Sequence, residues 1–388
     1  MNRTFLIWTN QHTLGAYHSH ADDTNPSATA GISGYNARMK YMQWTTRLLA
    51  LVTASLSACA GATLPMATTN NAVAMVKTDV DTYLVSFAGL GDGKTHDDVH
   101  ARVFQRRGSN QALTDAGQLP DKIGRLASVA IGVGPLAYVL GGYTVADDGA
   151  EVSTPAVWSY DPIAKSFQAL APMPIPVDDA VVVSYQDRYL YLVSGWHDLA
   201  NVNLVQRYDI ETNTWVQATP WPGESVFGHA GGIVGDTMVI CDGVTVQVAE
   251  AGPRQFALTD ACFRGVIRSD DARRIDWHRL PSHPGPALYR MAATGSTAMN
   301  AIVFAGGSSN AYNYNGIGYD GNPSAPSGQV FWYDVAADSW QQSPLAVTPT
   351  MDHRGLIETS DGVFSVIGGM RASQVVSDTV VAFSLENP

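Results

Sequence analysis

The chain has 388 residues, of which 45% are hydrophobic and only 15% charged, with 36 glycines and 20 prolines. Its net charge of −12 at pH 7 excludes the basic surface typical of nucleic-acid-binding proteins. After residue 58 no stretch is long and apolar enough to predict a membrane-spanning helix. Composition therefore favours a soluble, secreted, turn-rich all-β protein with no nucleic-acid partner.

The N-terminal 58 residues resemble a targeting sequence. Basic residues near Lys40 and Arg47 precede an apolar run over 48–56, and Leu-Ser-Ala-Cys at 56–59 matches a bacterial lipobox, in which Cys59 would be lipidated. We predict an upstream extension from a misassigned start over 1–38, a lipoprotein signal peptide over 39–58, and a mature N-terminus over 59–69. An ordinary cleavage site near Cys59 is the alternative. The expected location is the periplasm, with an outer-membrane lipid anchor at Cys59 as the only membrane contact.

Five segments run an apolar strand into a glycine turn. The last residues of these turns are Gly142, Gly195, Gly243, Gly307 and Gly369. Their spacing, 53, 48, 64 and 62 residues (142 to 195, 195 to 243, 243 to 307, 307 to 369), is close to the repeat of about 50 residues found in some β-propellers. The sequence therefore predicts a propeller.

An aromatic pair recurs at a constant offset inside these units, as Tyr160 with Phe167, Tyr208 with Trp215, and Tyr333 with Trp340. Together with the glycine turns this resembles the kelch repeat, which implies four-stranded blades. We predict six blades over 70–388, the first with a degenerate turn at 88–91. The last blade lacks a fourth strand, and residues 61–64 are expected to supply it and close the ring.

Cys241 and Cys262 fall on the expected second and third strands of blade four. A disulfide and two buried thiols are both compatible with this placement. Neither cysteine belongs to a metal-binding spacing, so no metal and no cofactor are predicted.

Polar residues stand where the innermost strands begin. These are Arg125, Asp179, His229, Arg290 and Arg354, with His353 beside the last. Arginines at equivalent positions of a ring would point at one axis, where they suit a carboxylate or phosphate. The alternative is that each arginine binds the backbone of the next blade.

A long turn after Gly307 is rich in tyrosine and asparagine, which suit a polyhydroxylated sugar. We place Asn313, Tyr314, Asn315 and Tyr319 in a binding wall, which Tyr143, Trp196 and His197 would complete from neighbouring turns. A self-packed loop whose asparagines only satisfy turns is the alternative.

The order of these features resembles the bacterial N-acetylneuraminate epimerases, or sialic acid mutarotases. Shared features are Leu-Pro at 64–65, Gly-Arg at 124–125, Phe-Ala-Gly-Gly at 304–307 with its long turn, and Arg354. The resemblance implies that an acidic sugar binds at the pore mouth and that its anomers are interconverted.

One departure concerns the catalytic residues that the resemblance implies. The family has an arginine directly before a Thr-Asp-Ala in blade four, and here Leu258 holds that place. Glu250 and Arg254 are the nearest substitutes, while Asp179 and His229 could also exchange protons. A non-catalytic carbohydrate-binding or protein-interaction propeller is the alternative; a copper oxidase is disfavoured, and the oligomeric state is not predicted.

Overall fold

The computed structural model describes residues 62–109, 111–247 and 254–385. The described chain is nearly all β, with two single-turn 3-10 helices, η1 (His96–Asp98) and η2 (Ala372–Gln374). None of its helices is long or apolar enough to cross a bilayer. The predicted segments 1–38 and 39–58, together with Cys59, lie outside the described residues.

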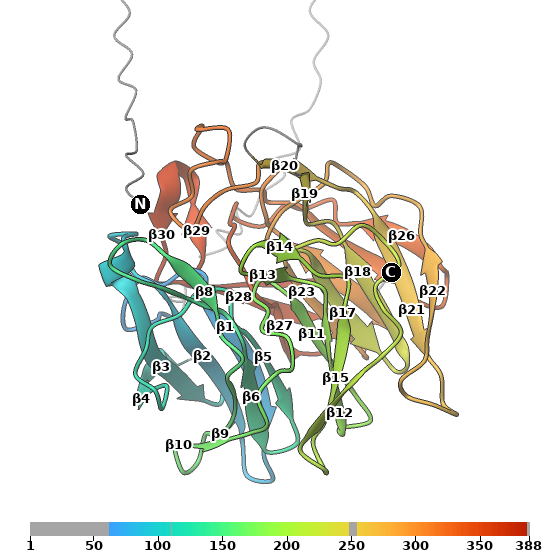
Figure 1. Cartoon of the computed structure of the whole chain (residues 1–388), viewed down its shortest axis with the longest axis horizontal. Helices are drawn as coiled ribbons and strands as arrows, with labels where there is room; N and C mark the ends of the chain where they lie inside the picture. The colour runs from blue at the N-terminus through green and yellow to red at the C-terminus, as the bar shows by residue number, and fades with distance from the viewer. Residues whose placement is uncertain (1–61, 110, 248–253, 386–388) are drawn as a thin grey trace, which may run out of the picture. The chain divides into compact units, whose positions relative to one another are not determined.

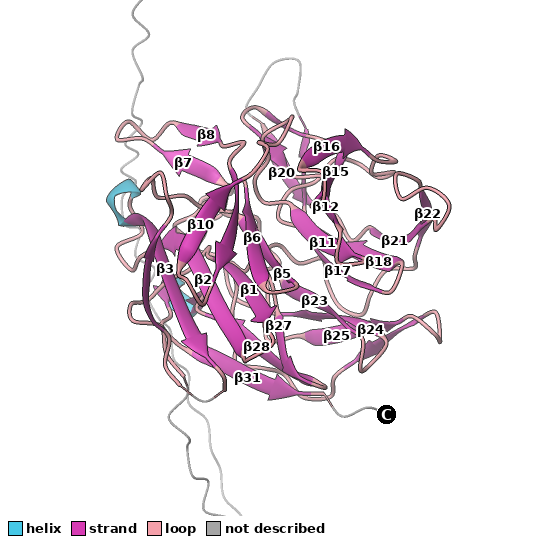
Figure 2. Cartoon of the chain, turned by 90° about the horizontal axis from the view of Figure 1, so that it is seen from below, coloured by secondary structure: helices cyan, strands magenta, loops and turns pink. Residues whose placement is uncertain are grey.

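Six antiparallel sheets surround a central axis, as Figure 2 shows, and five of them have four strands. Blade one holds β1 (Ala72–Lys77), β2 (Thr82–Leu90), β3 (Val99–Arg107) and β4 (Thr114–Gln118). Blade two holds β5 (Val129–Val133), β6 (Leu136–Leu140), β9 (Val157–Asp161) and β10 (Ser166–Ala169). Blade three holds β11 (Val181–Tyr185), β12 (Tyr189–Val193), β15 (Val205–Asp209) and β16 (Thr214–Gln217). Blade four holds β17 (Ala230–Val234), β18 (Thr237–Cys241), β21 (Cys262–Ile267) and β22 (Ile275–Arg279). Blade five holds β23 (Ala292–Ser296), β24 (Ala301–Ala305), β25 (Val330–Asp334) and β26 (Ser339–Gln342).

The sixth sheet has three strands of its own, β27 (Ile357–Ser360), β28 (Val363–Ile367) and β31 (Val380–Ser384). The N-terminal segment completes it: Leu64 N donates to Asp378 O at 2.6 Å, and Val380 N donates to Ala62 O at 2.8 Å. The six-bladed fold and its closure from the N-terminus are therefore confirmed. The pairing is short, and it covers the free edge that would otherwise invite association.

Four two-stranded hairpins follow the glycine turns, in blades two, three, four and six. They are β7 (Tyr143–Val145) with β8 (Glu151–Ser153), β13 (Trp196–His197) with β14 (Ala200–Asn201), β19 (Val244–Gln247) with β20 (Gln255–Leu258), and β29 (Met370–Arg371) with β30 (Val375–Val376). In Figure 1 the last three hairpins lie in the upper part of the propeller. Gly142 shows why the turn needs glycine: its φ is +90°, and a Cβ there would lie 2.6 Å from Leu126 O.

Six clusters of buried side chains form the core, one between each pair of adjacent blades. The predicted aromatic pairs are cross-strand neighbours, with ring centroids 4.6 Å apart for Tyr160 and Phe167 and 5.1 Å apart for Tyr333 and Trp340. Cys241 and Cys262 face each other across β18 and β21 and form a disulfide. The core thus holds the blades face to face and leaves the glycine-turn side free to carry a site.

Candidate functional site

One residue in each blade closes a ring around the propeller axis, just before the innermost strand. The six residues all have positive φ, and we call them the axial ring: Asn70, Ala127, Asp179, Gly228, Arg290 and Asp352. Backbone hydrogen bonds join Asp179 N to Ala127 O, Gly228 N to Asp179 O, Arg290 N to Gly228 O, His353 N to Arg290 O, and Asn70 N to Asp352 O, at 2.8 to 3.2 Å. The side chain of Asn70 completes the circle by accepting from Ala127 N.

The axial ring shows which residues hold equivalent positions in the six blades, and they differ from those expected from the sequence. Of the three arginines expected at equivalent positions, only Arg290 is a ring member. Arg125 lies two residues before Ala127, so its guanidinium does not reach the axis: it pairs with Asp121 and stacks 4.5 Å from the centroid of the Trp158 ring. Backbone hydrogen bonds form the ring. The type of side chain at each position therefore did not reveal which residue of a blade belongs to it.

Two of the predicted arginines do meet at the axis, where two carboxylates neutralise them. Arg290 pairs with Asp179 and, at 3.1 Å, with Asp352. Arg354 Nη2 lies 2.8 Å from Asp179 Oδ1 and donates to Asn70 Oδ1 at 2.9 Å. All four charged side chains are at most 3% exposed.

The charges of this network decide the protonation of Asp179. Burial alone would raise the pKa of its carboxyl, yet Arg290 and Arg354 outweigh burial and hold that pKa below its usual value. The two positive and two negative charges cancel, so the network offers no free cation to an anion.

The two predicted histidines are also buried beside the ring. His229 donates from Nε2 to Val193 O at 2.9 Å, and burial lowers the pKa of its ring to about 4. His353 lies 2.8 Å from Thr350 Oγ1 through Nε2, and burial, with Arg354 nearby, lowers the pKa of its ring to about 3. Both rings are neutral at pH 7 and have structural partners, which makes them poor proton-transfer groups for a ligand outside.

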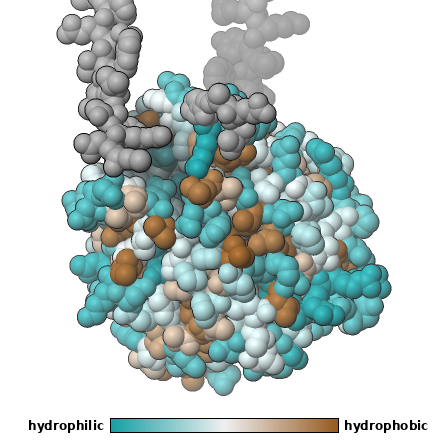
Figure 3. All heavy atoms as spheres, in the orientation of Figure 1, coloured by the Kyte–Doolittle hydropathy of each residue, from teal (hydrophilic) through white to brown (hydrophobic). Residues whose placement is uncertain are grey.

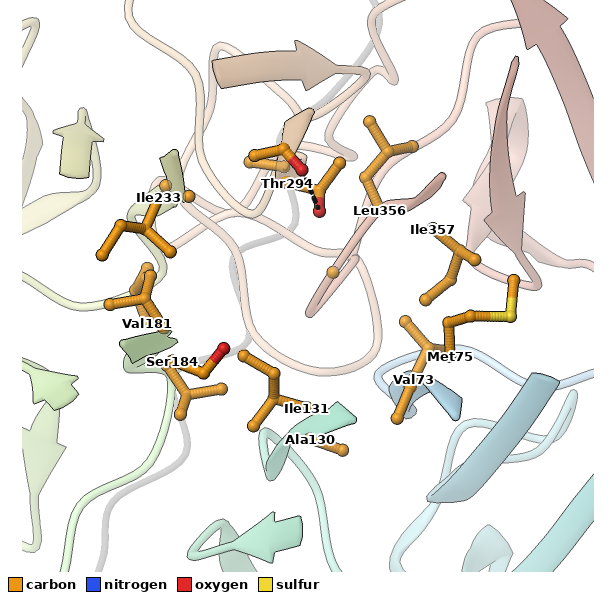
Figure 4. A pocket seen from close by; sticks show the side chains of 18 of the residues that line it. Val73, Met75, Ala130, Ile131, Val181, Ser184, Ile233, Thr294, Leu356 and Ile357 are labelled. Carbon is orange, nitrogen blue, oxygen red and sulfur yellow. Dashed lines mark hydrogen bonds between the residues drawn. The ribbon is translucent and has the colours of Figure 1, made fainter. Parts of the chain in front are cut away.

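Beneath the axial ring runs a central channel of about 610 Å³, which the innermost strands line. Asp179 and His353 lie at the end next to the axial ring, and Lys77, Asp187 and Asp361 lie at the other end. Figure 4 shows its wall of mainly aliphatic side chains: Val73, Met75, Ala130, Ile131, Val181, Ser184, Ile233, Thr294, Leu356 and Ile357. The charged side chains that line its axial-ring end, Asp179 and Arg354, already pair with each other, so the channel is a weaker candidate site than the face above it.

Above the axial ring, the hairpins and the long loop at 308–327 form what we call the collar. Ser153 N donates to Asp198 Oδ1 at 3.0 Å, which joins the blade-two and blade-three hairpins, and Asn201 Nδ2 donates to Val244 O at 2.9 Å, which joins blades three and four. Gln374 Nε2 donates to Ser324 O at 2.9 Å and fixes the loop to blade six. The collar is therefore a connected surface. On the side seen in Figure 3, hydrophobic residues lie in small groups among hydrophilic ones.

The predicted wall residues all lie in the collar, but they differ in their exposure and in their contacts. Tyr319 stacks on Phe256 with centroids 3.7 Å apart and is 37% exposed. Trp196 is half-buried, and the exposed Arg254 places its guanidinium 5.3 Å from the Trp196 ring centroid. Tyr314 packs on the cluster that contains the buried Tyr143. These residues form an aromatic surface beside one arginine.

The remaining predicted residues contribute less. Asn315 accepts from Ile317 N at 3.0 Å and so satisfies a turn, as the self-packed alternative supposed. Asn313 is exposed, and the half-buried ring of His197 lies 3.9 Å from the Asp198 carboxylate. Glu250 lies outside the described residues.

Two acidic residues, Glu151 in the collar and Asp178 beside the axial ring, were not predicted. Asp178 is 3% exposed and accepts from Ser153 Oγ at 2.6 Å; burial, and then the neighbouring Asp179, raise the pKa of its carboxyl well above the usual value. Glu151 is solvent-accessible on β8, yet surrounding protein desolvates its carboxyl enough to raise its pKa. Their position in and beside the hairpin after a glycine turn is the signal that could have identified them.

Comparisons with known proteins agree with this geometry. No family model matches the chain. Kelch-like protein 15 of Danio rerio is 24% identical over 269 residues, which cover 66% of this chain and 40% of that protein. Kelch-like protein 15 of Gallus gallus is 26% identical over 141 residues, or 36% of this chain and 28% of that protein. The chain thus spans less than half of the length of these relatives.

A solved structure described as "Structure of YjhT" superimposes with a TM-score of 0.63 at 15% identity, covering 84% of this chain and 97% of that one. At this identity the match speaks for the fold alone. Blade count, glycine turns and relatives together define a kelch-type β-propeller.

Proposed function

We propose that this propeller binds a carbohydrate on its collar, against Tyr319 and Trp196. The observation that carries the proposal is the aromatic surface built from separate blades: Tyr319 stacked on Phe256, and Trp196 next to Arg254. Flat aromatic faces with polar edges suit the apolar faces and hydroxyl groups of a sugar ring.

An acidic sugar would use Arg254 for its carboxylate. Arg290 and Arg354 already pair with Asp179 and Asp352, so an anion would have to displace a carboxylate to reach them. Arg254 is exposed, lies at the start of β20, and can form a charge-assisted hydrogen bond without that exchange.

Calorimetry against a panel of acidic and neutral sugars tests binding. Tyr319→Ala is expected to weaken binding roughly 2- to 10-fold, the usual worth of one aromatic contact. Ile163→Ala is the matched control, because Ile163 is 58% exposed in the turn between β9 and β10, away from the collar. Equal affinities of the two variants would move the site off the aromatic surface, and no binding by wild type would favour a protein ligand.

Sugar-acid mutarotation is the second candidate, and Glu151 favours it. Opening a cyclic hemiketal needs an acid and a base, and the raised pKa of this accessible carboxyl suits the acid. A proton NMR time course of anomer exchange decides between enzyme and binder. Glu151→Gln should slow exchange by about 10²-fold or more. Binding without accelerated exchange would leave the non-catalytic function.

A further inference from the structure

Blade four carries a cluster of ligating side chains at its glycine turn, away from the axial ring. Here the turn reads Cys241-Asp242-Gly243, so Asp242 takes a left-handed position, with φ of 65°, which glycine holds in blades two, five and six. Cys241 and Cys262 are the cross-strand partners that form the disulfide. The turn therefore places a carboxylate within 4.8 Å of the Cys262 sulfur.

His283 faces this carboxylate from the segment that leads into blade five. Its Nε2 lies 2.9 Å from Asp242 Oδ1, and both side chains are fully buried. Its Nδ1 lies 2.9 Å from Pro284 O, so Nδ1 carries the proton that is donated to this carbonyl. The ring stacks on Phe331 with centroids 4.2 Å apart. Nε2 is hydrogen-bonded to both Asp242 oxygens, at 2.9 and 3.0 Å, and a metal ion would take the place of the proton that this contact shares.

The surroundings match those of a bound metal ion. Ligating histidines commonly donate their second ring nitrogen to a backbone carbonyl, and ligating carboxylates are themselves hydrogen-bonded; here Leu288 N donates to Asp242 Oδ2 at 2.7 Å. One ligand atom each of Asp242, Cys262 and His283 lies within 4.8 Å of the others. A cavity of about 280 Å³ lies against Asp242, with Trp221 and Arg279 in its wall, and offers space for a water.

We propose that the reduced protein binds one zinc ion through Asp242, Cys262 and His283, with water in the fourth position, and that the disulfide prevents this binding. Thiolate, imidazole and carboxylate are together the ligand set of Zn²⁺. Tetrahedral zinc with bonds of about 2.0 to 2.3 Å needs ligand atoms about 3 to 4 Å apart. His283 Nε2 and Asp242 Oδ1 are already 2.9 Å apart, so it is the Cys262 sulfur, within 4.8 Å of them, that must approach by up to about 1 Å.

A dithiol reductant can reduce the disulfide and so release Cys262 for zinc. The reductant gives two electrons and two protons to the Cys241–Cys262 bond and becomes a cyclic disulfide itself. The Cys262 thiol then loses its proton to solvent as zinc binds its sulfur. Cys241 remains a thiol and is not a ligand.

Two cysteine variants separate ligation from loss of the disulfide, because each breaks the same bond. Cys241→Ser leaves Cys262 free and is expected to bind one zinc per chain without any reductant. Cys262→Ser should bind at least 10-fold more weakly. Wild type should bind zinc only after reduction, and Cys59→Ser should match wild type. Zinc bound per chain, measured by atomic absorption after removal of excess metal, is the readout.

Cobalt substitution gives a second measurement that needs no variant. Reduced wild type with Co²⁺ should show a thiolate-to-cobalt charge-transfer band and the visible absorption of a tetrahedral ion. His283→Gln should lose the spectrum, whereas His278→Gln, at an exposed position on β22, should keep it. Equal zinc binding by the two cysteine variants, or no band in the reduced wild type, would overturn the proposal.

Discussion

The axial ring and the collar lie on the same side of the propeller, yet they use polar residues in opposite ways. In the ring, Arg290 and Asp179 are at most 3% exposed and bond to each other. In the collar, Tyr319 is 37% exposed and Arg254 reaches solvent. The difference teaches that polar residues at a pore mouth divide into those that close the fold and those that can meet a ligand.

The largest expected effect on stability comes from removing one charge of the axial ring. Asp179→Asn leaves two buried arginines to share one carboxylate, and breaking a buried pair in this way costs about 3 kcal/mol or more. Urea unfolding should show that loss, while Asp361→Asn, at an exposed position at the far end of the channel, should stay within about 0.5 kcal/mol of wild type. Similar stabilities for both variants would mean that the ring charges do not hold the fold.

A smaller effect is expected from pH, through the histidine beside the ring. His353 has its pKa lowered from 6.5 to about 3, so as pH falls below 6.5 the unfolded chain takes up a proton that the folded chain refuses. The free energy of unfolding should therefore decrease on acidification, by about 1 kcal/mol per pH unit from this residue.

Urea titrations at pH 7 and 5.5 measure this slope for wild type and two variants. His353→Gln should reduce the slope by about the amount that this residue contributes and leave the part that the buried His229 contributes. His278→Gln should leave the slope unchanged, because His278 is exposed. A slope that His353→Gln leaves unchanged would assign the acid sensitivity to other groups.

The smallest effect concerns the collar arginine. Arg254→Gln should weaken binding of a carboxylated sugar about fivefold, or about 1 kcal/mol, because the contact is solvent-exposed. Its effect on a neutral sugar and on stability should be small. Arg274→Gln, exposed in the turn before β22, serves as the control. An equal loss of affinity for neutral sugars would mean that Arg254 packs on the ligand without binding its carboxylate.

The sequence predicted the fold well because its signals are local and repeated. A glycine turn requires positive φ in each blade, and the Tyr208–Trp215 pair has a fixed offset because its members are cross-strand neighbours. The sequence also placed Cys241 and Cys262 on adjacent strands of blade four, but it left open whether they form the disulfide that the structure shows.

The site was harder to predict because it depends on contacts between blades. Arg354 belongs near the axis and Arg125 does not, although both precede an innermost strand at a similar distance; only the hydrogen bonds of Ala127 and Asp352 reveal the difference. The acidic partners were missed for the same reason. Asp352 lies beside Arg290 because blades five and six are neighbours in the axial ring, and no spacing in the sequence predicts that pair.

One hydrogen bond of the axial ring joins the two ends of the propeller. Asn70 Nδ2 donates to Asp352 Oδ1 at 3.2 Å across a sequence separation of 282 residues. Joining points so far apart costs chain entropy that grows with loop length, and contacts of this kind slow folding. Blades two to five can each stack on the blade before them while the sixth is still unformed. We therefore expect the contact between the first and sixth blades to form last, and with it the axial ring that lies under the collar.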